Sequence, residues 1–207
     1  VFVRQRLLGR TQYSNNNHLE ITFMDKKWHS VTDTIIFSGP NGIKTFHLPF
    51  VPDAAMADMK EKISDATTDE AKTITRPGPV DYPQSFCTVI AEKVPDSALI
   101  RVTNNWIVPD TAQLLEPRLQ IIGTQYWTVE GVFPKGFSAK AKFAYNNSRG
   151  SYPGLNRDQN VTPILLYRRH AGLRWEEINS THEGTQITGT LATENLKPGE
   201  YAFGARK

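Results

Sequence analysis

The stretch from Tyr126 to Tyr145 constrains the fold of this chain more than any other part of the sequence. In its first half, Trp127 and Val129 alternate with the polar residues Thr128 and Glu130. Successive side chains of a β-strand point to opposite faces, so this alternation predicts a strand with one apolar face turned toward a core.

The second half of the stretch repeats the pattern, because Ala141 and Phe143 alternate with Lys140 and Lys142. The connector Pro134-Lys135-Gly136 favours a turn, since proline presets φ and glycine permits a positive φ. We therefore expect two strands on which Trp127 and Phe143 occupy facing positions in one core.

Short apolar runs separated by turn residues recur along the whole chain, with no sustained helical pattern. We predict an all-β fold of two tandem antiparallel β-sandwich domains, immunoglobulin- or fibronectin-III-like. The further predicted strands are Val1–Leu7, Leu19–Phe23, Thr34–Phe37, Ile43–Phe50, Phe86–Val94, Ala98–Val108, Ile164–Arg168, Leu173–Ile178, Thr185–Leu191 and Glu200–Phe203.

The segment Thr75–Pro79 is the expected domain boundary, because two prolines around a glycine resist both helix and sheet. We expect a small domain over 1–78, a linker over 79–83 and a larger domain over 84–207. Asn41-Gly42 between two apolar runs predicts a β-hairpin. Between Asp53 and Asp65, a short helix and an ordered loop both fit the sequence.

Composition excludes several classes of function. A net charge of +3 over 207 residues is too small for the dense basic face that binds nucleic acid. No window has the ~18 continuous apolar residues of a membrane-spanning helix. The one cysteine, Cys87, is expected to be a buried thiol. The start at Val1, without Met or a leader, is what an internal fragment of a longer protein would show.

No catalytic motif is present, and we expect the chain itself to have no enzymatic activity and no cofactor. His182-Glu183 is followed by Gln186 where the zinc motif HExxH needs a second histidine. His18, His29 and His47 are interpreted as scattered surface residues rather than metal ligands. The carboxylates Asp58, Glu61, Asp65 and Asp69 are expected to cap turns. The oxygens of Asn156, Asp158 and Asn160 lack the spacing of a calcium loop.

Aromatic residues leave two interpretations open. In a β-sandwich they usually fill the core, whereas a row of them exposed on one sheet suggests binding to a sugar or a protein. The possible surface-binding aromatics are Trp106, Tyr126, Tyr152 and Trp175. Asn104 interrupts the apolar face of its predicted strand, which favours either a bulge or a hydrogen-bonded polar core position.

Five stretches carry a resemblance to a known family: Glu61–Asp69, Asp96–Asp110, Gln125–Phe137, Ile164–Tyr167 and Gly199–Phe203. In consistent order, they resemble the C-terminal region of gluzincin zinc metallopeptidases of the aminopeptidase N and leukotriene A4 hydrolase family from Bacteroidetes-type bacteria. Those relatives have His-Asn-Trp or His-Thr-Trp where this chain has Asn104-Asn105-Trp106.

The resemblance implies a non-catalytic β tail that packs on, orients or tethers an upstream metallopeptidase domain of the same polypeptide. Zinc would belong to that upstream domain only, since neither HExxH nor a GxMEN-like loop occurs here. A periplasmic, outer-surface or secreted location is what the resemblance suggests. The alternative is a carbohydrate- or cell-surface-binding module. Aromatic side chains exposed on one sheet would favour this alternative.

Overall fold

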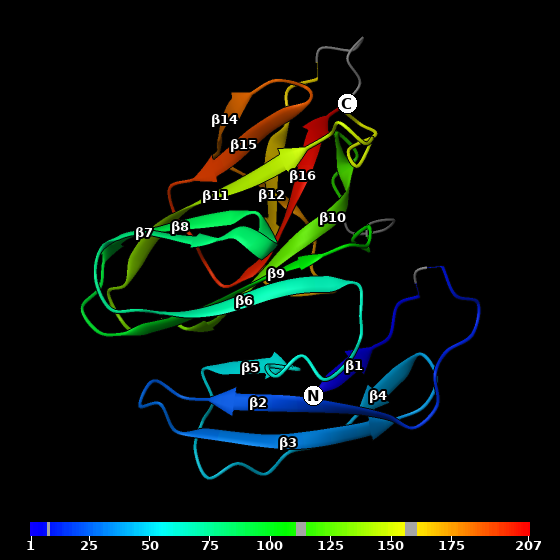
Figure 1. Cartoon of the computed structure of the whole chain (residues 1–207), viewed down its shortest axis with the longest axis vertical. Helices are drawn as coiled ribbons and strands as arrows, with labels where there is room; N and C mark the ends of the chain where they lie inside the picture. Colours follow the sequence, from blue (N-terminus) through cyan, green and yellow to red (C-terminus); the bar gives the residue numbers. More distant parts are fainter. Residues whose placement is uncertain (8, 111–114, 156–160) are drawn as a thin grey trace. The chain divides into compact units, whose positions relative to one another are not determined.

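A computed structural model describes residues 1–7, 9–110, 115–155 and 161–207. The chain is all-β with antiparallel sheets, which confirms the predicted fold class. It divides into two compact units, Val1–Ala66 and Thr67–Lys207 (Figure 1).

The smaller unit contains a three-stranded sheet in the order β3-β2-β5 and a two-stranded sheet of β1 and β4. Ile21, Phe23 and Ile35 project from one face of the larger sheet into a core, where Val3 of β1 packs on them. The strands are β1 (Phe2–Arg4), β2 (Asn17–Met24), β3 (Ser30–Phe37), β4 (Asn41–Ile43) and β5 (Ala54–Ala57).

The predicted hairpin at Asn41-Gly42 is wrong. Asn41–Ile43 is itself the strand β4, and it pairs with β1. Gly42 allows β4 to lie close to the side chain of Phe37, because a Cβ at this position would lie only 2.6 Å from Cβ of Phe37. The predicted strand Ile43–Phe50 ends at Ile43. Its alternation is nevertheless meaningful, since Phe46, Leu48 and Phe50 all pack against the core.

Between Asp53 and Asp65 the structure has a strand and an ordered turn rather than a helix. β5 pairs with β2, and its Met56 is fully buried. Asp58 then adopts a positive φ of 46°, and its carboxylate accepts hydrogen bonds from the amides of Lys62 at 2.9 Å and Ile63 at 2.8 Å. Asp58 therefore caps a turn, as its residue type predicts.

The larger unit is a sandwich of a six-stranded sheet, β13-β12-β16-β10-β9-β6, and a five-stranded sheet, β14-β15-β11-β8-β7 (Figure 1). Their inner faces share one apolar core. The elements are β6 (Thr67–Ile74), β7 (Gly78–Tyr82), the 3₁₀ turn η1 (Pro83–Ser85), β8 (Cys87–Lys93), β9 (Ala98–Asn105), β10 (Leu119–Val132), β11 (Ser138–Asn146), β12 (Ile164–Arg168), β13 (Glu176–Ile178), β14 (Thr181–Gly184), β15 (Thr188–Thr193) and β16 (Gly199–Arg206).

The stretch Tyr126–Tyr145 crosses from one sheet to the other. Its first half belongs to β10 in the six-stranded sheet, and its second half is β11 in the five-stranded sheet. Trp127 and Phe143 are fully buried, and their ring centroids lie 5.2 Å apart. Their predicted facing positions are thus confirmed, and each half contributes one wall of the core.

The expected linker 79–83 lies inside the larger unit. Gly78–Tyr82 is β7, which pairs with β8 in register, and the division between the units falls at Ala66 and Thr67 instead. Pro79 is compatible with this strand because β7 is the edge of its sheet, where a missing N–H leaves no ladder bond unmade. Pro79 therefore lies in an edge strand and not at the boundary between the two units.

Candidate functional site

Two of the four candidate surface aromatics are not on the surface, because Tyr152 and Trp175 are buried. Tyr152 packs 5.5 Å from Phe203, and its hydroxyl accepts a hydrogen bond from the side-chain amide of Gln125. Trp175 lies under the guanidinium of Arg168, 4.4 Å from the ring centroid. The expectation that these two rings form part of a binding surface is therefore wrong.

Both rings are buried because chain outside the strands folds back over the sandwich. Gly123 allows this approach for Tyr152, since a Cβ on Gly123 would lie 2.9 Å from its ring, and Gly154 lets the same segment approach Ile122. Trp175 forms an isolated parallel β-bridge with Leu115. Its side chain belongs to a small apolar cluster on the outer face of the six-stranded sheet. Alternation along single strands carries no information about such coverage.

The other two aromatics differ from each other. Tyr126 is half-buried and packs against the same outer cluster. Trp106 is 38% exposed, and its indole N–H donates to Oγ1 of Thr68 at 3.2 Å. Its ring stands at 89° to that of Phe86, with centroids 5.8 Å apart. Only Trp106 therefore behaves as a surface aromatic.

A row of polar side chains crosses the outer face of the six-stranded sheet. Register places Asp69 beside Thr103, Thr128 beside both Thr103 and Glu200, and Glu200 beside Arg168. Arg168 is buried and forms ion pairs with Glu200 and Asp110. Such charges are tolerated away from water because each has a partner.

A second arginine on the same face, Arg101, pairs in register with Glu130 and is also buried. Its Nε lies 2.5 Å from Oδ2 of Asp69, and its Nη1 lies 3.2 Å from Oε1 of Glu130. Burial raises the pKa of Glu130 to about 7, with Arg101 opposing the shift and Asp69 adding to it. Glu130 therefore takes up a proton near neutral pH, within a network that ties β6, β9 and β10 together.

The histidines do not converge on a metal. His29 pairs with Asp25 at 3.0 Å, and Nε2 of His182 lies 2.8 Å from the hydroxyl of Tyr145. Among the described residues, no group of three or more His, Cys, Asp or Glu side chains has metal-binding geometry. The calcium-loop candidates Asn156, Asp158 and Asn160 lie outside the described residues.

Cys87 is a free, buried thiol, as predicted, and burial raises its pKa.

The smaller unit has an exposed apolar surface that the sequence pattern does not predict. Phe2 of β1 and Ile43 of β4 are direct cross-strand partners, and they are 63% and 80% exposed. Arg4 and Asn41 form the next exposed pair on the same face. Alternation marks Phe2 and Arg4 as sharing a face, but only the pairing with β4 reveals that this face points outward.

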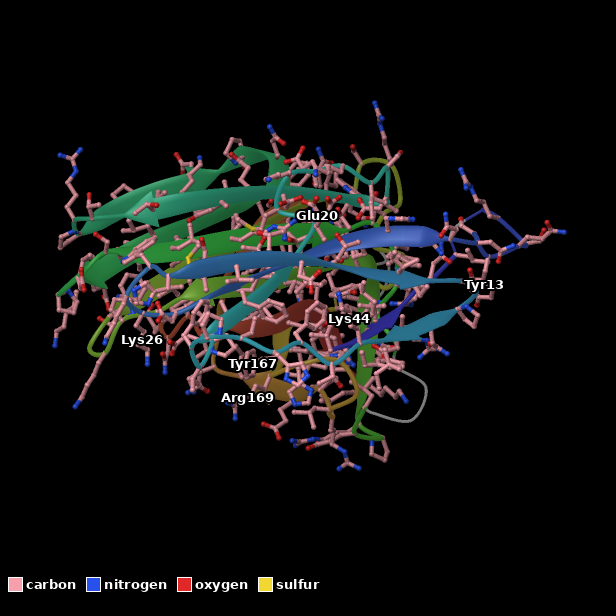
Figure 2. All side chains as sticks on the ribbon, turned by 90° about the horizontal axis from the view of Figure 1, so that it is seen from below. Tyr13, Glu20, Lys26, Lys44, Tyr167 and Arg169 are labelled. Carbon is pink, nitrogen blue, oxygen red and sulfur yellow. The ribbon has the colours of Figure 1, made fainter. Side chains whose placement is uncertain are left out.

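The neighbouring lysine is held in place beside this surface. Lys44 follows β4 and is labelled in Figure 2; its Nζ donates to Oδ2 of Asp33 at 2.8 Å and to the carbonyl of Thr34 at 2.7 Å. The same ammonium lies 4.7 Å from the ring centroid of Phe46. Arg4, on the same face of β1 as Phe2, adds an exposed positive charge beside the Phe2–Ile43 pair.

Comparison of the chain with protein-family models, curated proteins and solved structures gives no match. The similarity to gluzincin metallopeptidases therefore stays a prediction. None of the helices in the described ranges has the length and apolar character needed to cross a membrane.

Proposed function

We propose that this chain is a non-catalytic β region that packs on a metallopeptidase catalytic region and orients it. The observation that carries the proposal is the exposed Phe2–Ile43 pair on the β1–β4 ribbon. Zinc and catalysis would belong to the partner region. A periplasmic, outer-surface or secreted location and an immunoglobulin- or fibronectin-III-like topology accompany this proposal.

The inner face of the same ribbon is fully used by the fold of the smaller unit. Val3 packs into the core, and Gly42 lies against Phe37. Phe2 and Ile43 project from the opposite face and contribute nothing to that core. An apolar cross-strand pair beside an arginine suits a partner surface that is apolar and acidic.

The energetic consequence is large enough to matter for binding. Burying a phenylalanine or isoleucine side chain contributes about 1.5–3 kcal/mol. Loss of both contacts should therefore weaken an interface by more than tenfold, since about 1.4 kcal/mol corresponds to a factor of ten.

A sugar- or surface-binding module is the rival from another class. It depended on a row of exposed aromatics, and the burial of Tyr152 and Trp175 removes that row. This is why docking on a protein is the function that we put first.

The test is calorimetric titration of the chain with the gluzincin catalytic region that the proposal places upstream of it in the same polypeptide. We expect binding that the double substitution Phe2→Ser/Ile43→Ser weakens at least about tenfold. Val51→Ser is the matched control, because Val51 is 86% exposed but lies outside the ribbon. No binding by the unaltered chain, or equal binding by the double variant, would contradict the proposal.

A further inference from the structure

A hollow of about 350 Å³ lies on the outer face of the five-stranded sheet of the larger unit. Four adjacent strands, β7, β8, β11 and β15, contribute to its lining, so its floor is rigid. The residues that line it include Asp81, Pro83, Phe86, Thr88, Lys142 and Thr190.

Phe86 lines this hollow from an unfavourable backbone conformation. It has φ 52° and ψ 41°, the left-handed region that bulky residues rarely occupy, and its side chain is 44% exposed. The backbone is held by hydrogen bonds from its amide to the carbonyl of Pro83 and to its carbonyl from the amide of Ala144. Strained residues of this kind persist where surroundings enforce them, and they concentrate at ligand sites.

Trp106 fixes the direction of the Phe86 ring by its edge-on contact. The indole is in turn held by Thr68, whose hydroxyl donates to the carbonyl of Gln84 at 2.8 Å. The ring is thus an oriented apolar wall rather than a loose side chain.

The polar groups around this wall supply both donors and acceptors. Oδ1 of Asp81 accepts from the hydroxyl of Thr88 at 2.8 Å, which orients the carboxylate. Nζ of Lys142 lies 3.9 Å from Oε2 of Glu183, too far for a hydrogen bond. The carboxylates of Asp81 and Glu183 offset the charge of Lys142, so the hollow has no excess positive charge to attract an anion.

We propose that this hollow binds a neutral hexopyranose, with the C–H face of the sugar ring on Phe86 and its hydroxyls on Asp81, Lys142 and Thr190. An aromatic wall with a few convergent polar groups is the composition of small-ligand sites. Strand addition by an extended peptide is possible only along β7, the edge strand, because β8, β11 and β15 pair with neighbours on both sides. The site is separate from the β1–β4 ribbon and goes beyond the docking role.

The experiment is an NMR titration of the full chain with the methyl glycosides of glucose, galactose and mannose, and in separate titrations with sialic acid and with an unstructured peptide, following backbone amides. At least one glycoside should shift the amides of β7, β8, β11 and β15 that surround the hollow. Phe86→Asn should weaken this binding at least about tenfold. Asparagine tolerates the left-handed conformation, so the melting temperature should not fall, whereas a purely structural Phe86 would lower it.

A second pair of variants keeps the test independent of folding. Lys142→Met should lose binding, while Lys140→Met should retain it. Lys140 lies on the same face of β11 but is paired with Glu92 and Glu194. Both variants should bind the metallopeptidase catalytic region as the unaltered chain does, so failure of one proposal leaves the other standing.

Three results would overturn the assignment. They are no shift with any glycoside, a preference for sialic acid over the neutral sugars, and equal binding by Phe86→Asn or Lys142→Met. Shifts of the amides around the hollow with an unstructured peptide, but not with the glycosides, would show that the hollow binds a peptide and not a sugar.

Discussion

Asn104 occupies a core position of the larger unit that an apolar side chain would fill at lower cost. It is fully buried, and neither polar atom of its amide has a hydrogen-bond partner among the described residues. The bulge expected as one alternative is wrong, since β9 pairs in unbroken register through Asn104, and among the described residues no hydrogen bond satisfies its amide. The residue type alone indicates an unusual core position, and the strand pairing shows that β9 stays regular through it.

Replacing Asn104 by the nearly isosteric leucine should therefore stabilise the protein. Removing an unsatisfied buried amide is expected to raise the free energy of unfolding by about 1–3 kcal/mol. Urea unfolding of Asn104→Leu and the unaltered chain measures the difference. A lower stability for the variant would mean that the amide has a partner, such as a buried water.

Glu130 makes stability depend on pH. Its folded pKa of about 7 lies above the ordinary value of 4.5, so the folded protein binds the proton more tightly than the unfolded chain. The contribution of Glu130 is then complete below about pH 4.5 and is lost as the pH rises through 7. We expect a decrease of about 1–3 kcal/mol over this range, less than the full shift implies because the carboxyl is partly solvated.

Glu130→Gln isolates this contribution, because glutamine cannot ionise. The free energy of unfolding of the variant should decrease less between pH 5 and 7.5 than that of the unaltered chain. Parallel pH profiles for the two proteins would show that the carboxyl titrates at an ordinary pKa.

At the scale of elements, the strand β7 separates what local pattern can predict from what it cannot. The alternation of Trp127, Val129 and Phe143 predicted strands correctly because each side chain of a half-buried strand faces either core or solvent. Prolines at 77, 79 and 83 suggested a linker instead, since edge pairing cannot be inferred from composition. Similarly, Gly42 has a turn-like neighbour in Asn41, but its contact with Phe37 decides its role.

Tyr82 provides the test of β7 as a structural strand. Its ring is fully buried, and its hydroxyl donates to the carbonyl of Ile100 at 3.2 Å. Tyr82→Ala should cost about 3–5 kcal/mol, the range for large aromatic side chains removed from a core. Pro79→Ala on the outward side of the same strand should change stability by less than about 0.5 kcal/mol. A small effect of Tyr82→Ala in chemical denaturation would restore the linker interpretation.

At the scale of the whole molecule, the sequence predicts the fold class better than the sites. Periodic alternation of apolar and polar residues predicts strands, and many short strands separated by turns predict a β-sandwich. The candidate surface depends on which strands pair and which segments cover a sheet, and these are long-range properties. For this reason Tyr152 and Trp175 are buried, against the prediction from the sequence, and the exposure of Phe2 and Ile43 does not follow from alternation alone.

Docking through the β1–β4 ribbon is the central function proposed for this molecule. Hydrogen–deuterium exchange of the chain, alone and with the metallopeptidase catalytic region, measures this most directly. We predict slower exchange at Phe2–Arg4 and Asn41–Ile43 in the presence of the catalytic region, with β7 and β8 unchanged. Unaltered exchange in β1 and β4, or protection confined to the strands around the hollow, would contradict the docking role.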